Sequence, residues 1–273
     1  MTNPALRVAI LGVSGRMGRA LLSAIDERPE AKLTGASASP SSQWNGKDAG
    51  EPFGSTRRGV TISGDVALAI RDADVAIDFT LPEATAGNLR ACVAAGRPVV
   101  IGTTGHDEAA RQEIARAAER IPVISAPNMS LGVNLLLKLV EMTAARLDAG
   151  YDIEIFEAHH RNKKDAPSGT ALALGRSAAQ GRGVSLDAVA EMAREGNTGA
   201  RGRGAIGFSV FRGGDVVGDH TVTFAGIGER IELTHRASDR MAFARGAVAA
   251  AAWLAGRKPG LYSMQDVLGL NDR

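Results

Sequence analysis

The stretch that decides the fold is Arg7-Val-Ala-Ile-Leu-Gly-Val-Ser-Gly-Arg-Met-Gly18, near the start of the chain. Its first five residues form an apolar run typical of a buried strand, and an amphipathic helix toward Asp26 follows. Gly12 permits a tight turn, Gly15 lets the backbone approach a pyrophosphate, and Gly18 lets the helix pack closely on the sheet. The stretch predicts a dinucleotide-binding strand–turn–helix, although its Gly-x-x-Gly-x-x-Gly spacing departs from the usual Gly-x-Gly-x-x-Gly.

Strands and helices alternate along the rest of the first half of the chain. Runs that read as strands end in small or polar groups at Asp78-Phe-Thr80, Gly102-Thr-Thr-Gly105 and Ala126-Pro-Asn-Met129, and helix-prone stretches cover 83–95 and 107–120. Apolar strands in this alternation predict a parallel sheet with helices on both faces. Because such sheets bind ligands at the carboxyl ends of their strands, the three polar segments predict a nucleotide site.

The segment after the second strand departs from the familiar dinucleotide pattern. Residues 32–37 read as that strand, and dinucleotide-binding folds usually place Asp or Glu at its end, on the adenosine ribose. Here the sequence is Gly35-Ala-Ser-Ala-Ser-Pro40, with hydroxyls and no carboxylate before Asp48. A carboxylate would repel the 2′-phosphate of NADPH, so we expect both cofactors to work, with NADPH modestly favoured. The Ser/Gly/Pro-rich connection at 39–59 is expected to be a long surface loop.

The second half begins with a long apolar helix, from residue 130 to about residue 147, which would carry the chain between domains. Extended segments follow at 151–157, 205–211, 216–224 and 230–235, and they predict a mixed sheet of about four strands. The turns at 213–215 and 226–229 are both compatible with hairpins. A sheet covered on one face would leave its other face available for a partner subunit.

Together these patterns predict an α/β fold with two domains. Residues 1–129 form a dinucleotide-binding domain around a Rossmann-like, doubly wound parallel sheet. Residues 130–239 form a smaller α+β domain for substrate binding and oligomerisation. An alanine-rich helix to Trp253 then begins the segment 240–273, which returns the chain to the dinucleotide-binding domain.

The densest polar chemistry lies in Glu157-Ala-His-His-Arg-Asn-Lys-Lys-Asp-Ala-Pro-Ser-Gly-Thr-Ala171. The histidines fall at a strand end, the lysines lie in a loop, and Ser168 or Thr170 can cap the helix that follows. Histidine offers a proton near neutral pH, lysine a fixed positive charge, and the helix start unpaired N–H groups. The stretch predicts an active site for a small carboxylate substrate; a solvated basic loop with capping residues is the alternative. Since strand side chains alternate, His159 and His160 are expected to point in opposite directions and to differ in role.

The other histidines and the single cysteine are expected to be structural. His220 and His235 lie inside strand patterns, His106 sits where it would cap a helix, and Cys92 lies in an apolar, helix-like run. One cysteine excludes an internal disulfide. No metal site is predicted.

Composition narrows the class of protein. The chain has 273 residues, 44% hydrophobic content and a net charge of +2, with basic and acidic residues interspersed. This predicts an ordinary α/β protein with no nucleic-acid or membrane-surface role. The sequence has no apolar run of about 18 residues and no basic-then-apolar signal segment, so a cytoplasmic enzyme is expected.

Several of these motifs resemble those of one enzyme family. The run from Glu157 to Ala171 resembles the signature of the dihydrodipicolinate reductase family, and the likeness covers essentially the whole chain. Further matching motifs are Gly12-x-x-Gly-Arg-Met-Gly18, Asp78-Phe-Thr80, Gly102-Thr-Thr-Gly105, Ala126-Pro-Asn128, Gly132-Val-Asn134, Arg194-Glu-Gly196 and Val217-Gly-x-His220. The resemblance implies that NADH or NADPH reduces 4-hydroxy-tetrahydrodipicolinate to tetrahydrodipicolinate with loss of water, in lysine and diaminopimelate synthesis. It also implies a homotetramer assembled through the C-terminal sheets.

The resemblance implies roles for individual residues. His159 and Lys163 would be the proton-handling pair, and His160, Gly169 and Thr170 would bind the substrate. The cofactor would be lined by Gly12, Val13, Ser14, Gly15, Arg16, Met17, Gly102, Thr103, Thr104, Ala126, Pro127, Asn128 and Met129. Hydride arriving at the ring leaves enamine-like electron density, which a histidine or lysine acid would protonate, a step worth roughly 10²- to 10⁴-fold in rate.

Two other classes of protein share part of this pattern. An NAD(P)-dependent dehydrogenase of another small carboxylic acid would keep the glycine loop, but it would not need His-His-x-x-Lys with Pro-Ser-Gly-Thr. A non-catalytic dinucleotide-sensing module would have no reason to aim histidines and lysines at a helix N-terminus. The sequence therefore favours the reductase over both.

Overall fold

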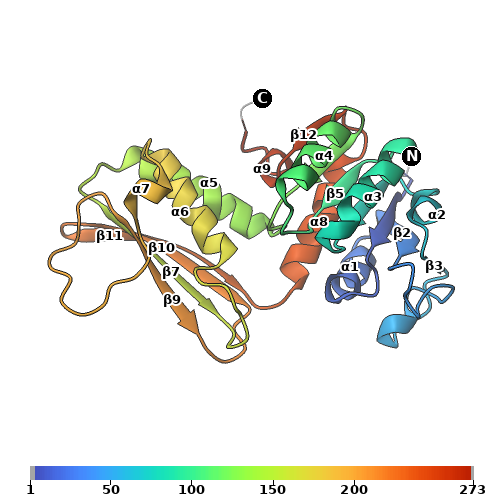
Figure 1. Cartoon of the computed structure of the whole chain (residues 1–273), viewed down its shortest axis with the longest axis horizontal. Coiled ribbons are helices and arrows are strands. Elements are labelled where there is room, and N and C mark those ends of the chain that lie inside the picture. Colours follow the sequence, from blue (N-terminus) through green and yellow to red (C-terminus); the bar gives the residue numbers. More distant parts are fainter. Residues whose placement is uncertain (1–3, 272–273) are drawn as a thin grey trace. The chain divides into compact units, whose positions relative to one another are not determined.

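The computed structural model describes residues 4–271 and separates into two compact units (Figure 1). The first unit consists of the chain up to Leu131 and of the chain from Arg240 onward. The second unit is Gly132–Asp239. The second unit is therefore inserted into the first, whose core is assembled from chain on both sides of the insertion.

Within residues 4–271, seven strands form the sheet of the first unit: β1 (Leu6–Leu11), β2 (Ala31–Ser37), β3 (Ile62–Ser63), β4 (Val75–Asp78), β5 (Val99–Ile101), β6 (Pro122–Ser125) and β12 (Gly260–Tyr262). Their order is β12-β6-β5-β4-β1-β2-β3, and every neighbouring pair is parallel. The strand order reverses between β1 and β4, the point at which doubly wound sheets bind dinucleotides. The predicted Rossmann-like fold is confirmed.

Helices cover both faces of this sheet. Successive side chains of β1 enter two separate cores, as expected for a strand buried on both sides. Val8 and Ile10 face the core that α1 and α8 cover, whereas Ala9 and Leu11 face the core under α2, α3 and α4. The helices are α1 (Arg16–Asp26), α2 (Val66–Ile70), α3 (Pro82–Ala94), α4 (Glu108–Ala118), α8 (Met241–Leu254) and the short α9 (Met264–Val267).

The connection at 39–59 is largely irregular, as expected, with one short 3-10 helix, η1 (Glu51–Phe53). The carboxylate of Asp48 ties this segment together, because it accepts the N–H groups of Gly50, Arg58 and Gly59 at 2.9, 2.8 and 2.8 Å. The short elements β3 and α2, which follow it, were not predicted. Elements of two to five residues carry no readable hydrophobic period.

The second unit contains a mixed sheet of five strands within the described residues, ordered β11-β10-β7-β9-β8. One face of the sheet packs against helices, and Figure 1 shows these helices on one side of the strands. No helix in the described chain is long and apolar enough to cross a membrane. The elements are α5 (Leu131–Arg146), β7 (Asp152–His159), α6 (Gly169–Gly181), α7 (Leu186–Val189), β8 (Ala190–Glu191), β9 (Ile206–Arg212), β10 (Gly218–Gly226) and β11 (Glu229–Ala237).

Two details of this sheet differ from the sequence prediction. The fifth strand, β8, has two residues and gave no pattern to detect. The turn at 213–215 is not a hairpin, because β9 and β10 lie on opposite sides of β7. Glycines in a turn permit a reversal of direction, but they do not determine which strand becomes the neighbour. The turn at 226–229 does close the β10–β11 hairpin, with Gly228 at a φ of 87°.

The prediction that His106 caps the helix now seen as α4 was wrong. Asp107, not His106, caps this helix, since its carboxylate accepts the Ala110 N–H at 2.7 Å. His106 instead lies 2.9 Å from the Thr85 hydroxyl. Cys92 is buried within the core under α3, and burial raises the pKa of its thiol to about 12, which agrees with a packing role.

Candidate active site

The end of β7 places Glu157 and His159 on one face of the second sheet. The two residues are separated by one position on the strand, so their side chains point the same way. Both residues are buried, with exposed fractions of 1% and 8%. His159 Nδ1 lies 2.5 Å from Glu157 Oε2. Burial lowers the pKa of His159 from its ordinary value, and the hydrogen bond with Glu157 partly offsets this effect.

The Glu157 carboxylate collects hydrogen bonds from three parts of the chain. Arg212 on β9 donates from Nη1 to Oε2 and from Nη2 to Oε1, both at 2.7 Å. The backbone N–H of Ser168, at the start of α6, donates to Oε1 at 2.9 Å. Burial opposes ionisation, but the hydrogen bonds from Arg212, His159 and Ser168 outweigh it and hold the pKa of Glu157 below its usual value. The carboxylate is therefore ionised at neutral pH.

The loop between β7 and α6 is anchored by the same arginine. Arg212 Nη2 donates to the backbone carbonyl of Asp165 at 2.6 Å. The Asp165 carboxylate in turn accepts from Lys163 Nζ at 2.9 Å to each oxygen. The Lys163 charge is near enough to contribute to the lowered pKa of His159. The structure thus brings His159 and Lys163 into one neighbourhood.

His160 lies just beyond the strand, where the chain turns into the loop. Its backbone N–H donates to the Val216 carbonyl at 2.7 Å, so the connection between β9 and β10 passes the end of β7. Its ring is half-buried, and the Nδ1 atom is buried without a hydrogen-bond partner among the described residues. A buried ring nitrogen of this kind is available to a polar ligand.

The start of α6 is capped by Ser168. Its hydroxyl oxygen accepts the Ala171 N–H at 3.1 Å, and it also lies 3.0 Å from His220 Nε2. Of the two capping residues considered from the sequence, Ser168 takes the role. Gly169 is exposed, and a Cβ added there would meet no atom within 4 Å. Thr170 is half-buried in the first turn of the helix.

Strand β10 contributes two residues to the surroundings of His159. The rings of His220 and His159 meet edge to face, with centroids 5.1 Å apart. Burial lowers the pKa of His220 to about 4, so it is neutral at physiological pH. A Cβ on Gly218 would lie 3.0 Å from His159 Nε2 and 3.4 Å from Cδ2. Gly218 therefore leaves space beside the nitrogen that Glu157 does not hold.

In the first unit, the glycine turn fits a dinucleotide. Gly12 has a φ of 84°, and a Cβ there would lie 3.1 Å from the Phe79 carbonyl oxygen. A Cβ on Gly18 would lie 1.8 Å from the Val13 carbonyl oxygen, so only glycine permits this packing of α1. Gly15 is the N-cap of α1 and no side chain caps the helix. A helix start of this kind accommodates a phosphate group.

The remaining segments predicted to line the cofactor stand at the ends of β5 and β6. Thr103 is buried and bonds the Thr80 carbonyl at 3.1 Å, while Thr104 is exposed. A Cβ on Gly102 would lie 2.2 Å from the Phe79 ring, so this glycine is fixed by packing. After β6, Ala126 and Met129 are buried, Pro127 is exposed and Asn128 is half-buried. All these residues lie at the carboxyl edge of the parallel sheet, with the glycine turn.

Sequence reasoning gave no individual role to Glu157, although it begins the stretch predicted as the active site, and it missed Arg212. The spacing of Glu157 and His159 on a strand was a usable signal, because positions i and i+2 share a face. Arg212 gave no signal, since its place beside His159 depends on the parallel pairing of β7 with β9.

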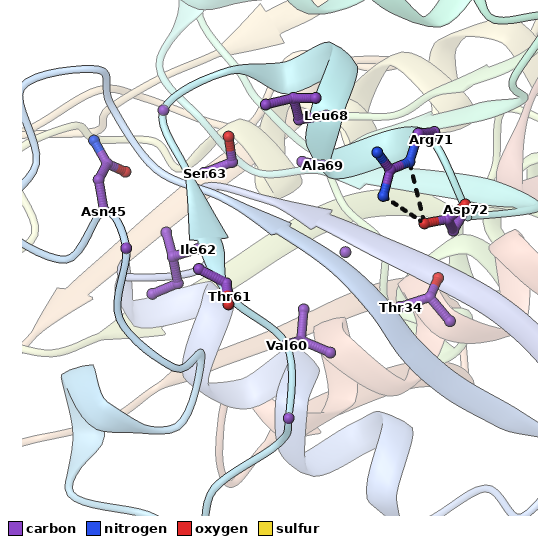
Figure 2. Close-up of a pocket in the computed structure, with 14 residues that line it drawn as sticks. Thr34, Asn45, Val60, Thr61, Ile62, Ser63, Leu68, Ala69, Arg71 and Asp72 are labelled. Carbon is purple, nitrogen blue, oxygen red and sulfur yellow. Dashed lines mark hydrogen bonds and ion pairs between the residues drawn. The ribbon is translucent and has the colours of Figure 1, made fainter.

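A separate pocket of about 510 Å³ lies beside β2, β3 and α2 in the first unit (Figure 2). Thr34, Asn45 and Ser63 line it, and an ion pair between Arg71 and Asp72 lies at one end. None of the site residues predicted from the sequence is among its lining residues. The pocket is therefore distinct from the polar cluster of the second unit.

Comparison with known proteins gives a consistent result over nearly the whole chain. Family models described as dihydrodipicolinate reductase, N-terminus, and dihydrodipicolinate reductase, C-terminus, match residues 6–129 and 132–268. A 4-hydroxy-tetrahydrodipicolinate reductase of Thiobacillus denitrificans is 58% identical over 97% of this chain and 99% of its own length. That of Alkalilimnicola ehrlichii is 56% identical, again over 97% and 99%. Among solved structures, a dipicolinate-bound dihydrodipicolinate reductase from Paenisporosarcina sp. TG-14 is 25% identical, with a TM-score of 0.78 over 96% of this chain and 98% of that one.

Proposed function

Because the chain belongs to the dihydrodipicolinate reductase family, we propose that its second unit binds and protonates the substrate, with His159 and Lys163 as the proton-handling pair. The chain is an oxidoreductase that uses NADH or NADPH to reduce 4-hydroxy-tetrahydrodipicolinate to tetrahydrodipicolinate, with loss of water. The reaction belongs to lysine and diaminopimelate biosynthesis.

The observation that carries the proposal is the convergence of unlike polar groups at the end of β7. A buried histidine within hydrogen-bond distance of a carboxylate, a lysine loop and a capped helix start are joined there through Glu157 and its partner Arg212. Active sites concentrate such groups, because an acid must be held near the anionic parts of a substrate. A solvated basic loop would not require a buried histidine.

The chemistry assigns a distinct task to each group. The substrate is a ring with two carboxylates, and loss of its hydroxyl gives a conjugated imine. Bound nicotinamide supplies the hydride that reduces this imine. In its cationic form His159 carries a transferable proton at Nε2, since Nδ1 is engaged by Glu157, and it delivers that proton to the enamine-like carbon. Lys163 places a positive charge beside the developing and permanent negative charges of the substrate.

The substrate carboxylates are assigned to His160 and to the start of α6. The N–H groups of Gly169 and Thr170 lie at the positive end of the helix dipole, which favours an anion. The buried Nδ1 of His160 offers a further polar contact. This division matches the expectation that the two adjacent histidines differ in role.

We assign the dinucleotide to residues 1–129 and 240–273, which lie within the first unit, and substrate binding and oligomerisation to residues 130–239. The glycine turn from Gly12 to Met17 takes the pyrophosphate, where the lack of side chains and the uncapped helix start favour it. Gly102 to Thr104 and Ala126 to Met129, at the ends of neighbouring strands, line the nicotinamide end.

We also infer that the protein is a cytoplasmic homotetramer assembled through the open face of the second sheet. Phe156 and Phe211 are 45% and 47% exposed on β7 and β9. Strand alternation and register place them on the face opposite α5 and α6. Exposed aromatic side chains on an uncovered sheet favour contact with another copy of the same sheet.

The roles of His159 and Lys163 are tested by steady-state oxidation of NADPH with substrate generated by the preceding synthase. His159→Gln and Lys163→Ala should each lower kcat by about 10- to 10⁴-fold, while the Kd for NADPH stays near that of the wild type. Lys164→Ala is the matched control, because this lysine lies next to Lys163 but has no assigned task. It should retain kcat. A wild-type kcat at saturating substrate in either test variant would remove that residue from the proposal.

A further inference from the structure

We propose that Glu157 is a positioning residue, which fixes the tautomer and orientation of His159 and links it to the lysine loop and the start of α6. The inference rests on the proposed role of His159 as the proton donor. It adds a residue that the reaction needs but that has no direct contact with the substrate in this scheme.

The tautomer of His159 follows from the ionised state of Glu157. A carboxylate can only accept a hydrogen bond, so the proton between Glu157 Oε2 and His159 Nδ1 belongs to the imidazole. When His159 is neutral, Nε2 is therefore the unprotonated nitrogen, and when it is cationic, Nε2 carries the transferable proton. Without a partner at Nδ1, neutral imidazole would divide between both tautomers.

The space around His159 supports the same orientation. Gly218 leaves the space beside Nε2 open, because a Cβ on Gly218 would lie 3.0 Å from that nitrogen. His220 packs edge to face against the ring and limits its rotation. The ring is thus held at Nδ1 by Glu157, bounded on one side by His220, and open beside Nε2.

Glu157 also fixes the rest of the site relative to His159. Its Oε1 accepts a hydrogen bond from the N–H of Ser168, and this bond holds the N-terminus of α6 beside Glu157. Its bidentate partner Arg212 holds the Asp165 carbonyl, which attaches the loop that carries Lys163. One carboxylate therefore sets the mutual positions of the proton donor, the lysine loop and the anion-binding helix start. Positional errors of about 1 Å in such arrangements cost about 10²-fold in rate.

The charge of Glu157 has a measurable consequence for the acid. The charged or titratable groups facing His159 are Glu157 on its own strand, Arg212 on β9, His220 on β10, and Lys163 with Asp165 in the loop. Arg212 and Lys163 disfavour the imidazolium, whereas Glu157 favours it. Removal of the Glu157 charge should therefore lower the pKa of His159 further. Since a general acid must be protonated, kcat should then begin to fall at a lower pH.

The first experiment is the pH profile of kcat for Glu157→Gln, Glu157→Asp and Glu154→Gln with the synthase-generated substrate. Glu157→Gln should lose about 10- to 100-fold in kcat, and its high-pH limb should move to lower pH, with little change in the Kd for NADPH. Glu157→Asp keeps the charge, so its limb should return toward that of the wild type. Glu154→Gln is the control, because Glu154 lies on the same strand but pairs with Arg194 and Arg201 away from His159.

A second measurement reads the tautomer in the wild-type protein and uses a variant only to assign the signals. Nitrogen-15 NMR of histidine-labelled protein reports the tautomer directly, and His159 is identified by the signals missing from His159→Gln. Neutral His159 should show a protonated Nδ1 and an unprotonated Nε2.

The outcomes separate this inference from the proposed function. A protonated Nε2 in neutral His159, or a Glu157→Gln limb that stays at the wild-type pH, overturns the positioning role even if kcat is reduced. If His159→Gln is inactive in that case, the proposed function stands alone. If His159→Gln keeps wild-type kcat, the proposed function fails, whereas the tautomer result still stands for the structure.

Discussion

At the residue scale, the buried His220 should make the stability of the folded protein depend on pH. It is 4% exposed, and burial, reinforced by the charge of His159, lowers its pKa to about 4. Its Nε2 lies 3.0 Å from the Ser168 hydroxyl, and Ser168 caps α6. A neutral His220 therefore supports the helix start that is assigned to the substrate carboxylates.

In the unfolded chain His220 has an ordinary pKa near 6.5. Between about pH 6.5 and 4 it is therefore protonated in the unfolded chain but neutral in the folded protein. Stability from His220 is therefore fully present above about pH 6.5 and is lost as the pH falls to about 4, by about 3 kcal/mol in total. His220→Gln should reduce this loss. Urea unfolding at pH 7.5 and 4.5 measures it, followed by circular dichroism because Trp44 and Trp253 both lie in the first unit. An equal loss in variant and wild type would contradict the prediction.

The local structure around individual residues was predicted correctly where the pattern lies within one segment. His159, Lys163 and Ser168 are close in sequence, so a strand, a loop and a cap could be read directly. Arg212 and Gly218 could not be found this way, because they reach His159 only through the pairing of β7 with β9 and β10. Cross-strand register is a property of the folded sheet, and no local pattern encodes it.

At the scale of elements, we expect the end of β2 to influence the choice between NADH and NADPH. Ser37 ends the strand, and its carbonyl accepts the N–H groups of Gly12 and Val13 at 3.0 and 2.9 Å. Ala38 follows and is buried, whereas Ser39 and Ser41 are exposed, with their hydroxyls 3.1 Å apart. These hydroxyls can donate to a 2′-phosphate, but more weakly than a bidentate arginine would.

We therefore expect both cofactors to work, with NADPH modestly favoured. Ser39→Glu should shift the ratio of kcat/KM toward NADH, because a carboxylate repels the 2′-phosphate and accepts from the ribose hydroxyls. Ser55→Glu, an exposed serine in the same connection, is the control and should leave the ratio unchanged. Steady-state kcat/KM with each cofactor decides the matter, and a strong wild-type preference for NADH would refute it.

The longest strands were predicted and the missed strands are among the shortest, although β5, with three residues, was predicted from its apolar run. β1, β7 and β10 have six to nine residues, enough for an alternating or continuous apolar pattern. β3, β8 and β12 have two or three residues and gave no pattern of their own. Such short strands form because a neighbouring strand edge is already in place, so tertiary context determines them.

At the scale of the whole molecule, the open face of the second sheet makes assembly testable. Phe156→Glu and Phe211→Glu should each dissociate the proposed tetramer, because a buried carboxylate without a partner is costly at an apolar contact. Val184→Glu is the control, since Val184 is similarly exposed, at 44%, but lies just after α6 rather than on the sheet. Light scattering during size-exclusion chromatography gives the mass of each species. A monomeric wild type, or tetramers in both phenylalanine variants, would refute this mode of assembly.

The insertion of one unit into the other has a consequence for synthesis on the ribosome. Every residue assigned to the cofactor has emerged by Met129, yet Val248, Leu254 and Met264, which fill the core beneath α1, follow the whole second unit. At ordinary translation speeds that delay lasts roughly 5 to 25 seconds. Throughout it, one apolar face of the nascent nucleotide sheet is covered by α1 but not yet by α8, and chaperones can shield the part left open. The last helices thus govern when a finished cofactor site first exists, although they supply none of its assigned residues.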